Sequence, residues 1–140
     1  MKKRTFIVLM IMALITALCF TACGSKEEMT LEKFCADNPE VQESIDQAMA
    51  DSNVLVEIKE NAIIYTFDLS KMDGYTEEIA KSDVIKENLN TALDAAAGTF
   101  GNISKSVEES TETQGISTVV NYNWNDENIV TRTFTSADAG

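Results

Sequence analysis

The chain has 140 residues, which suits a single domain, and a formal net charge of −12. This acidic balance disfavours nucleic acid as a partner, because binding to phosphates needs clustered lysine and arginine. The sequence contains no histidine, so it excludes every mechanism in which an imidazole acts as base, nucleophile or metal ligand.

The first 22 residues have the build of a secretory signal peptide. Residues 1–4 are basic, residues 6–18 are almost entirely apolar, and two small residues follow at positions 21–22. A membrane-spanning helix needs about 20 apolar residues, and this run is shorter. We therefore expect residues 1–22 to be removed. The three basic residues at 2–4 would leave with them, so the net charge would fall from −12 to −15.

Cys23 directly follows the two small residues at positions 21–22, within the stretch Phe20-Thr21-Ala22-Cys23-Gly24-Ser25. This stretch resembles the lipobox of bacterial lipoproteins, although Phe20 stands where leucine is commonest. In that family a diacylglyceryl group is attached to the cysteine thiol, and the chain is cut just before it. Two acyl chains hold a protein stably on a bilayer. The resemblance implies lipid attachment at Cys23 and a location on the extracytoplasmic side of the cell membrane. Cys19 is a poorer candidate, because the bulky Leu18 precedes it.

The remaining chain divides into a short linker, one domain and a tail. Residues 23–30 form the lipidated N-terminus and a polar linker, of which residues 24–30 reach at most about 25 Å when extended. We expect a single domain over residues 31–135, close above the membrane. Residues 136–140 are expected to form a small polar tail.

Two short helices are expected at the start of the domain. Thr30 can cap a helix over residues 31–36. Asn38 followed by Pro39 is a helix start signal, and the apolar spacing beyond it predicts a helix over residues 39–50.

A β-hairpin should follow these helices. Apolar and polar residues alternate over 54–59 and again over 63–68, as is typical of half-buried strands. Glu60-Asn61 is a plausible two-residue turn, because asparagine tolerates a positive φ. Residues 68–74 then form a loop.

A long helix is predicted next, because apolar residues recur at steps of three and four from Ile85 to Val107. Its start lies between Tyr75 and Asp83. Gly98 and Gly101 fall inside it, which predicts either a closely packed neighbour or a bend.

A second hairpin ends the domain, with strands over residues 116–124 and 129–134 and a turn between them. The fold class is therefore α+β in the order helix, hairpin, helix, hairpin. We expect a four-stranded antiparallel sheet with both helices packed on one face. The open sheet face is the natural place to look for binding.

Several stretches of this layout carry a second resemblance. They are Leu31-Glu32-Lys33-Phe34, Asn38-Pro39-Glu40-Val41-Gln42, the strand pair around Asn61 with Tyr65-Thr66-Phe67, residues 89–93, Tyr122 and Phe134. Together they resemble a family of small lipoproteins from Gram-positive, largely gut-dwelling bacteria that is catalogued only as a domain of unknown function. The resemblance implies the membrane location and the fold, and it supplies no catalytic residues.

The strongest candidate contact residues are Asn121, Tyr122, Asn123 and Trp124. Strand alternation places the amides on one face and the aromatic rings on the other. Amides beside the only tryptophan could bind a sugar or a peptide. The alternative is that the rings pack under the helices and the amides face water. An exposed Trp124 would favour a contact site.

Two other candidate sites are weaker. The acidic loop from Asp68 to Gly74 offers oxygen ligands for calcium, but Met72 occupies a ligand position and the glycine comes one residue late. We expect a solvated loop there, and no metal or cofactor. Cys35 lies on an apolar helical stripe and is expected to be buried.

The function expected from the sequence is a membrane-anchored, non-enzymatic module that binds a protein, a peptide or a cell-wall component. The first alternative is a structural or accessory subunit, or an inhibitor, of an envelope or secreted protein. The second is a hydrolase that uses carboxylates alone. The chain lacks the Walker, GxGxxG, zinc-ligand, GxSxG and SxxK patterns that would indicate a familiar enzyme class.

Overall fold

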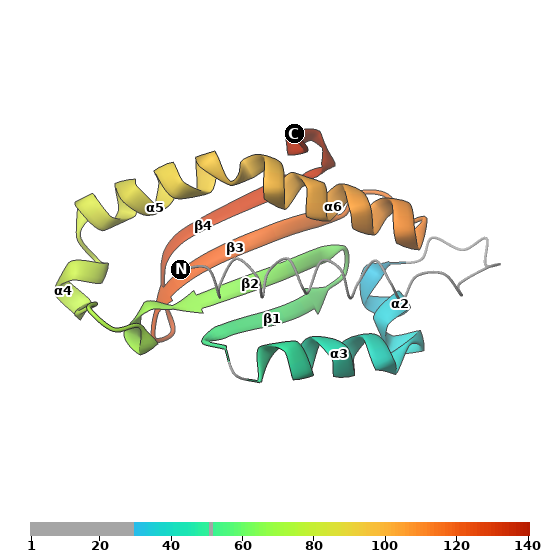
Figure 1. The fold of residues 1–140 in the computed structure, drawn as a ribbon, viewed down its shortest axis with the longest axis horizontal. Helices are drawn as coiled ribbons and strands as arrows, with labels where there is room; N and C mark the ends of the chain where they lie inside the picture. The colour runs from blue at the N-terminus through green and yellow to red at the C-terminus, as the bar shows by residue number, and fades with distance from the viewer. Residues whose placement is uncertain (1–29, 51) are drawn as a thin grey trace.

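The computed structural model describes residues 30–50 and 52–140 (Figure 1). The expected signal peptide and Cys23 lie outside these residues. In the described ranges no helix combines the length and the apolar character needed to cross a membrane.

Two helices begin the described chain, α2 over Leu31–Asp37 and α3 over Pro39–Met49. The predicted cap is confirmed, because Thr30 Oγ1 accepts a hydrogen bond from the backbone N–H of Lys33 at 3.2 Å. Pro39 is the first residue of α3, as predicted. Asn38 makes no side-chain cap for α3 and instead donates from Nδ2 to the carbonyl of Phe34 at 2.8 Å. Asn38 therefore closes α2.

Four strands form one sheet in the order β1-β2-β3-β4. They are β1 Val54–Lys59, β2 Ala62–Asp68, β3 Ser117–Trp124 and β4 Glu127–Thr135. The pairs β1–β2 and β3–β4 are antiparallel hairpins, whereas β2 and β3 run parallel, with Tyr65 opposite Val120.

The α+β class and the four-stranded sheet are confirmed. The prediction of a purely antiparallel sheet is wrong at the β2–β3 seam, the line along which the two hairpins meet, because β2 and β3 are parallel. A hairpin sets the direction of its own two strands only. The helices between β2 and β3 return the chain to the end of the sheet at which β2 begins, so β3 runs in the same direction as β2.

The long helix predicted after the first hairpin consists of three helices, preceded by a 3₁₀ turn. These are η2 Leu69–Lys71, α4 Glu77–Ala80, α5 Asp83–Ala95 and α6 Ala97–Thr111. A simple alternation of one helix and one hairpin therefore does not describe the chain.

Local backbone features explain the two breaks between these helices. Ser82 caps α5, because its Oγ accepts from the backbone N–H of Ile85 at 3.3 Å. Ala96 lies between α5 and α6 with φ −96° and ψ 2°, outside the usual α-helical range. The apolar stripe continues across both breaks, so periodicity alone does not reveal them.

One face of the sheet and the helices enclose a single apolar core. Tyr65 of β2 and Phe134 of β4 are buried on this face, together with Ile45 of α3 and Ile103 of α6. Phe100 of α6 stacks on Phe134 with ring centroids 5.1 Å apart. Figure 1 shows α5 and α6 running along the β4 side of the sheet, with α2 and α3 along the β1 side.

The last residues return to the helical layer. They form the 3₁₀ helix η3, Ser136–Asp138, which packs against α6. A Cβ atom built on Gly101 would lie 2.4 Å from the backbone N of Ala139, so only glycine allows this approach. A Cβ on Gly98 would lie 3.5 Å from Gly140, an ordinary contact.

Candidate functional site

A groove of about 690 Å³ lies over the sheet face that points away from the core. Leu55, Thr66 and Asn121 share its floor because they are paired across three neighbouring strands. Asp68 and Asn123 form the next paired row, at the ends of β2 and β3. A volume of this size is typical of ligand sites in proteins.

Two segments form the rims of this groove. Asp46 and Met49, near the end of α3, lie beyond β1. Asn125 and Asp126, in the turn between β3 and β4, form the opposite rim. The groove therefore combines residues from both halves of the domain.

The groove is acidic. Among the described residues that line it, the carboxylates are Asp46, Glu57, Asp68 and Asp126, and the only ammonium group belongs to Lys71. A concave surface lined mainly by one sign of charge favours ligands of the opposite sign.

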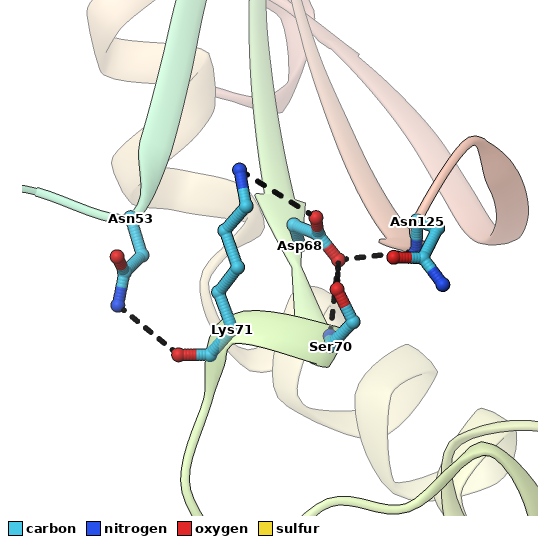
Figure 2. Close-up of polar contacts among 5 residues, drawn as sticks. All are labelled: Asn53, Asp68, Ser70, Lys71 and Asn125. Atoms are coloured by element: carbon cyan, nitrogen blue, oxygen red, sulfur yellow. Dashed lines mark hydrogen bonds and ion pairs between the residues drawn. The ribbon is translucent and has the colours of Figure 1, made fainter.

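Asp68 makes structural contacts with its neighbours (Figure 2). Its Oδ1 accepts from the backbone N–H of Ser70 at 3.0 Å, from Ser70 Oγ at 2.6 Å and from the backbone N–H of Asn125 at 3.1 Å. Lys71 Nζ lies 3.8 Å from Oδ2. Burial acts to raise the pKa of Asp68, but these hydrogen bonds and the charge of Lys71 outweigh it, so the pKa lies below its ordinary value.

Two connections near Asp68 hold this end of the groove in place. The bond to Asn125 joins the end of β2 to the β3–β4 turn. Asn53 donates from Nδ2 to the carbonyl of Lys71 at 3.3 Å, which ties the start of β1 to the end of η2 (Figure 2).

Asn121 and Asn123 are held differently, through their side-chain carbonyl oxygens. Asn121 Oδ1 accepts from Thr131 Oγ1 at 2.9 Å, and Asn123 Oδ1 accepts from Asn128 Nδ2 at 3.0 Å. Both donors belong to β4. Neither Nδ2 group has a protein acceptor within residues 30–50 and 52–140, so both donors are available to a ligand.

The two aromatic candidates do not line the groove. Tyr122 packs on the core side, where its ring stacks on Phe67 with centroids 5.0 Å apart. Burial, with a smaller effect from Tyr75, raises the pKa of Tyr122. Trp124 is partly buried. Of the four candidate contact residues, the structure brings only Asn121 and Asn123 together in the groove.

Sequence reasoning did not identify several groove residues. Leu55 and Glu57 occupy the strand positions opposite the core, and their alternation could have placed them on the open face. Leu55 is 57 % exposed, so its side chain contributes apolar surface to the groove. Asp46 could not have been found, because its approach to the sheet depends on how α3 packs.

The remaining three candidates are Cys23, the acidic loop and Cys35. Cys23 lies outside the described residues. Of the described residues, no three His, Cys, Asp or Glu side chains are grouped so that they could hold a metal ion. Part of the acidic loop forms η2, with Asp68 as its cap. The thiol-bearing Cys35 is buried, as predicted.

Comparisons with known proteins identify the family. Neither the curated proteins nor the solved structures gave a match. A family model described as a domain of unknown function, DUF4854, matches residues 31–134. This match spans helices α2 to α6, strands β1 to β3, and β4 up to its last residue but one. The chain therefore belongs to the DUF4854 family of domains of unknown function.

Proposed function

We propose that the protein is a lipid-anchored, extracytoplasmic binding module that catalyses no reaction. The groove on the open sheet face carries the binding part of this proposal. Its volume falls within the range of ligand pockets, and it is lined by Asn121 and Asn123, whose Nδ2 groups have no protein acceptor among the described residues. The sheet and its core supply a rigid floor for these donors.

The anchor is supported by the lipobox-like stretch around Cys23 and by the basic and apolar segments that precede it. The domain begins at Leu31, soon after that cysteine. The short linker keeps the groove within a few tens of ångströms of the bilayer.

The absence of catalysis is supported by the chemistry of the groove. The chain has no histidine. Asp68, the groove carboxylate with the most hydrogen bonds, has a lowered pKa and is ionised at neutral pH. A general acid needs the opposite shift. Asp68 Oδ1 accepts three hydrogen bonds that connect parts of the fold, so this oxygen is not available to act as a general base.

The anchor is tested by substituting Cys23→Ser in the full chain and following incorporation of labelled fatty acid in a bacterial host. We expect Cys23→Ser to lose the label and leave the membrane fraction. Cys19→Ser is the matched control and should keep both. Fatty-acid label that persists in Cys23→Ser would contradict the anchor.

The binding role is tested by filling the groove. Thr66→Trp places a large ring on the groove floor, whereas Thr133→Trp places the same ring on β4, outside the groove but at another open-face position. Membrane-anchored wild-type protein and Thr133→Trp should retain the same extracytoplasmic component, and Thr66→Trp should not. Equal retention by all three would contradict a binding role for the groove.

A further inference from the structure

We propose that the groove receives an extended peptide carrying lysine or arginine side chains. This inference rests on the binding function proposed above and names its ligand class. Three observations carry it: the charge of the groove, the spacing of the residues that bear its free donors, and the apolar surface on its β1 side.

The charge comes from carboxylates that keep free oxygen atoms. Asp46 Oδ1 accepts from Gln42 Nε2 at 2.8 Å, which leaves its Oδ2 free. Glu57 Oε1 lies 3.9 Å from Lys59 Nζ, a loose and exposed pair. Asp126 has no ion pair among the described residues. Asp46 and Glu57 belong to α3 and β1 on one side of the groove, whereas Asp126 belongs to the β3–β4 turn, so these carboxylates can contact successive cationic side chains.

Lys71, the only lysine or arginine among the described residues that line the groove, does not neutralise these carboxylates. Lys71 Nζ is near Asp68 alone, at 3.8 Å, and its side chain is 68 % exposed. A basic ligand would therefore be attracted by Asp46, Glu57 and Asp126 and repelled by Lys71.

The free amide donors favour a peptide over a compact amine. Asn121 and Asn123 are two residues apart on β3, so their Cα atoms recur at about 6.5–7 Å along the strand. The carbonyl groups on one side of an extended peptide recur at the same interval. Two donors in this arrangement match two carbonyl groups of a peptide backbone.

The apolar surface suits the stems of long basic side chains. Leu55 on the floor is largely exposed, and Met49 lies on the rim. Lysine and arginine can bury their methylene groups against such surface while the charged end reaches a carboxylate. Tyr122 and Trp124 lie outside the groove, so it offers no aromatic platform for a stacked sugar ring.

The proposal is tested by fluorescence anisotropy on the full, lipidated protein purified in detergent. The probe is a short fluorescein-labelled peptide that alternates lysine and serine. The comparison probes alternate glutamate with serine and glutamine with serine. We expect the lysine peptide to bind, to weaken steeply with added salt, and to bind at least tenfold more tightly than either comparison peptide.

Charge variants of opposite sign sharpen this test. The double variant Asp46→Asn with Glu57→Gln should weaken binding by about two- to fivefold per lost carboxylate. Lys71→Gln should tighten it by about twofold, because it removes the repelling charge. The matched controls are Glu87→Gln with Glu109→Gln, and Lys105→Gln, all on helices outside the groove. These controls should change binding by less than half as much.

The outcomes separate this inference from the proposed function. No binding of the lysine peptide, or equal effects of groove and control variants, would overturn the basic-peptide inference. Binding of the glutamine or glutamate peptide that Thr66→Trp abolishes would also overturn it, while leaving the binding function in place. Competition by a free polyamine at equal charge would show that the groove takes cations without selecting a peptide. The fatty-acid content of the same preparation reports on the anchor independently.

Discussion

The two glycines of α6 provide a paired test of how the C-terminus packs. At Gly98 an added Cβ meets Gly140 at 3.5 Å, which is ordinary contact. Gly98→Ala should therefore raise the free energy of unfolding by up to about 1 kcal/mol, the helix-propensity difference. At Gly101 the same Cβ lies 2.4 Å from both Ala139 N and the carbonyl carbon of Asp138. These are backbone atoms, so the whole segment must move.

The expected changes therefore differ in sign. Overpacking of this kind costs about 1–3 kcal/mol, which exceeds the propensity gain. Gly101→Ala should lower the free energy of unfolding by up to about 2 kcal/mol. At roughly 4 °C per kcal/mol, thermal unfolding followed by circular dichroism should resolve both shifts.

A shortened chain gives the result that would refute this reasoning. In a chain that ends at Thr135, the atoms that meet Gly101 are absent. Gly101→Ala should then become stabilising, like Gly98→Ala, because only the helix propensity remains. If Gly101→Ala still lowers the Tm of the shortened chain, the contact with Ala139 is not the cause.

Three further predictions concern single side chains. Tyr65 Oη is buried and has no hydrogen-bond partner among the described residues, so Tyr65→Phe should stabilise the protein by up to about 1 kcal/mol. Burial raises the pKa of Tyr65, so the wild type should also lose stability relative to Tyr65→Phe as the pH rises above about 10, measured by urea unfolding. The lowered pKa of Asp68 predicts that Asp68→Asn lowers the free energy of unfolding by about 1 kcal/mol at neutral pH. This difference between wild type and variant should disappear as the pH falls below the ordinary aspartate pKa, and a difference that stays constant down to acidic pH would contradict the prediction. Glu60 has a φ of 52°, in the left-handed region that favours glycine, so Glu60→Gly should stabilise the protein by about 1 kcal/mol. Asn125→Gly should stabilise it less, because asparagine tolerates a positive φ; equal shifts in Tm for the two variants would count against the argument.

Much of the local structure could be predicted from the sequence. The hairpins follow from strict alternation, and the first two helices follow from Thr30 and Pro39. Other local details were less visible. The positive φ of the first turn falls on Glu60 and not on Asn61, whose Oδ1 instead accepts from the backbone N–H of Leu31 at 3.0 Å. That contact joins residues thirty positions apart, and no local pattern signals it.

The parts that could not be predicted all depend on packing between distant segments. The parallel seam is set by the path of the helices across the sheet. The groove needs Thr66 beside Asn121 and the end of α3 beside β1. Side chains alternate between the two faces of a β-strand, so the sequence predicted that Asn121 and Asn123 lie on the face opposite Tyr122. It could not predict which residues would surround them.

The parallel seam also bears on the order in which the protein folds. Each hairpin closes over a two-residue turn, whereas β2 and β3 meet only after the chain of residues 69–116 has been closed into a loop. Loop closure of this length has an entropic cost that local turns avoid, so the seam should form late. Thr66 and Asn121 stand on opposite sides of it. The groove therefore comes into existence only when the two halves join, and any ligand that spans it would oppose their separation.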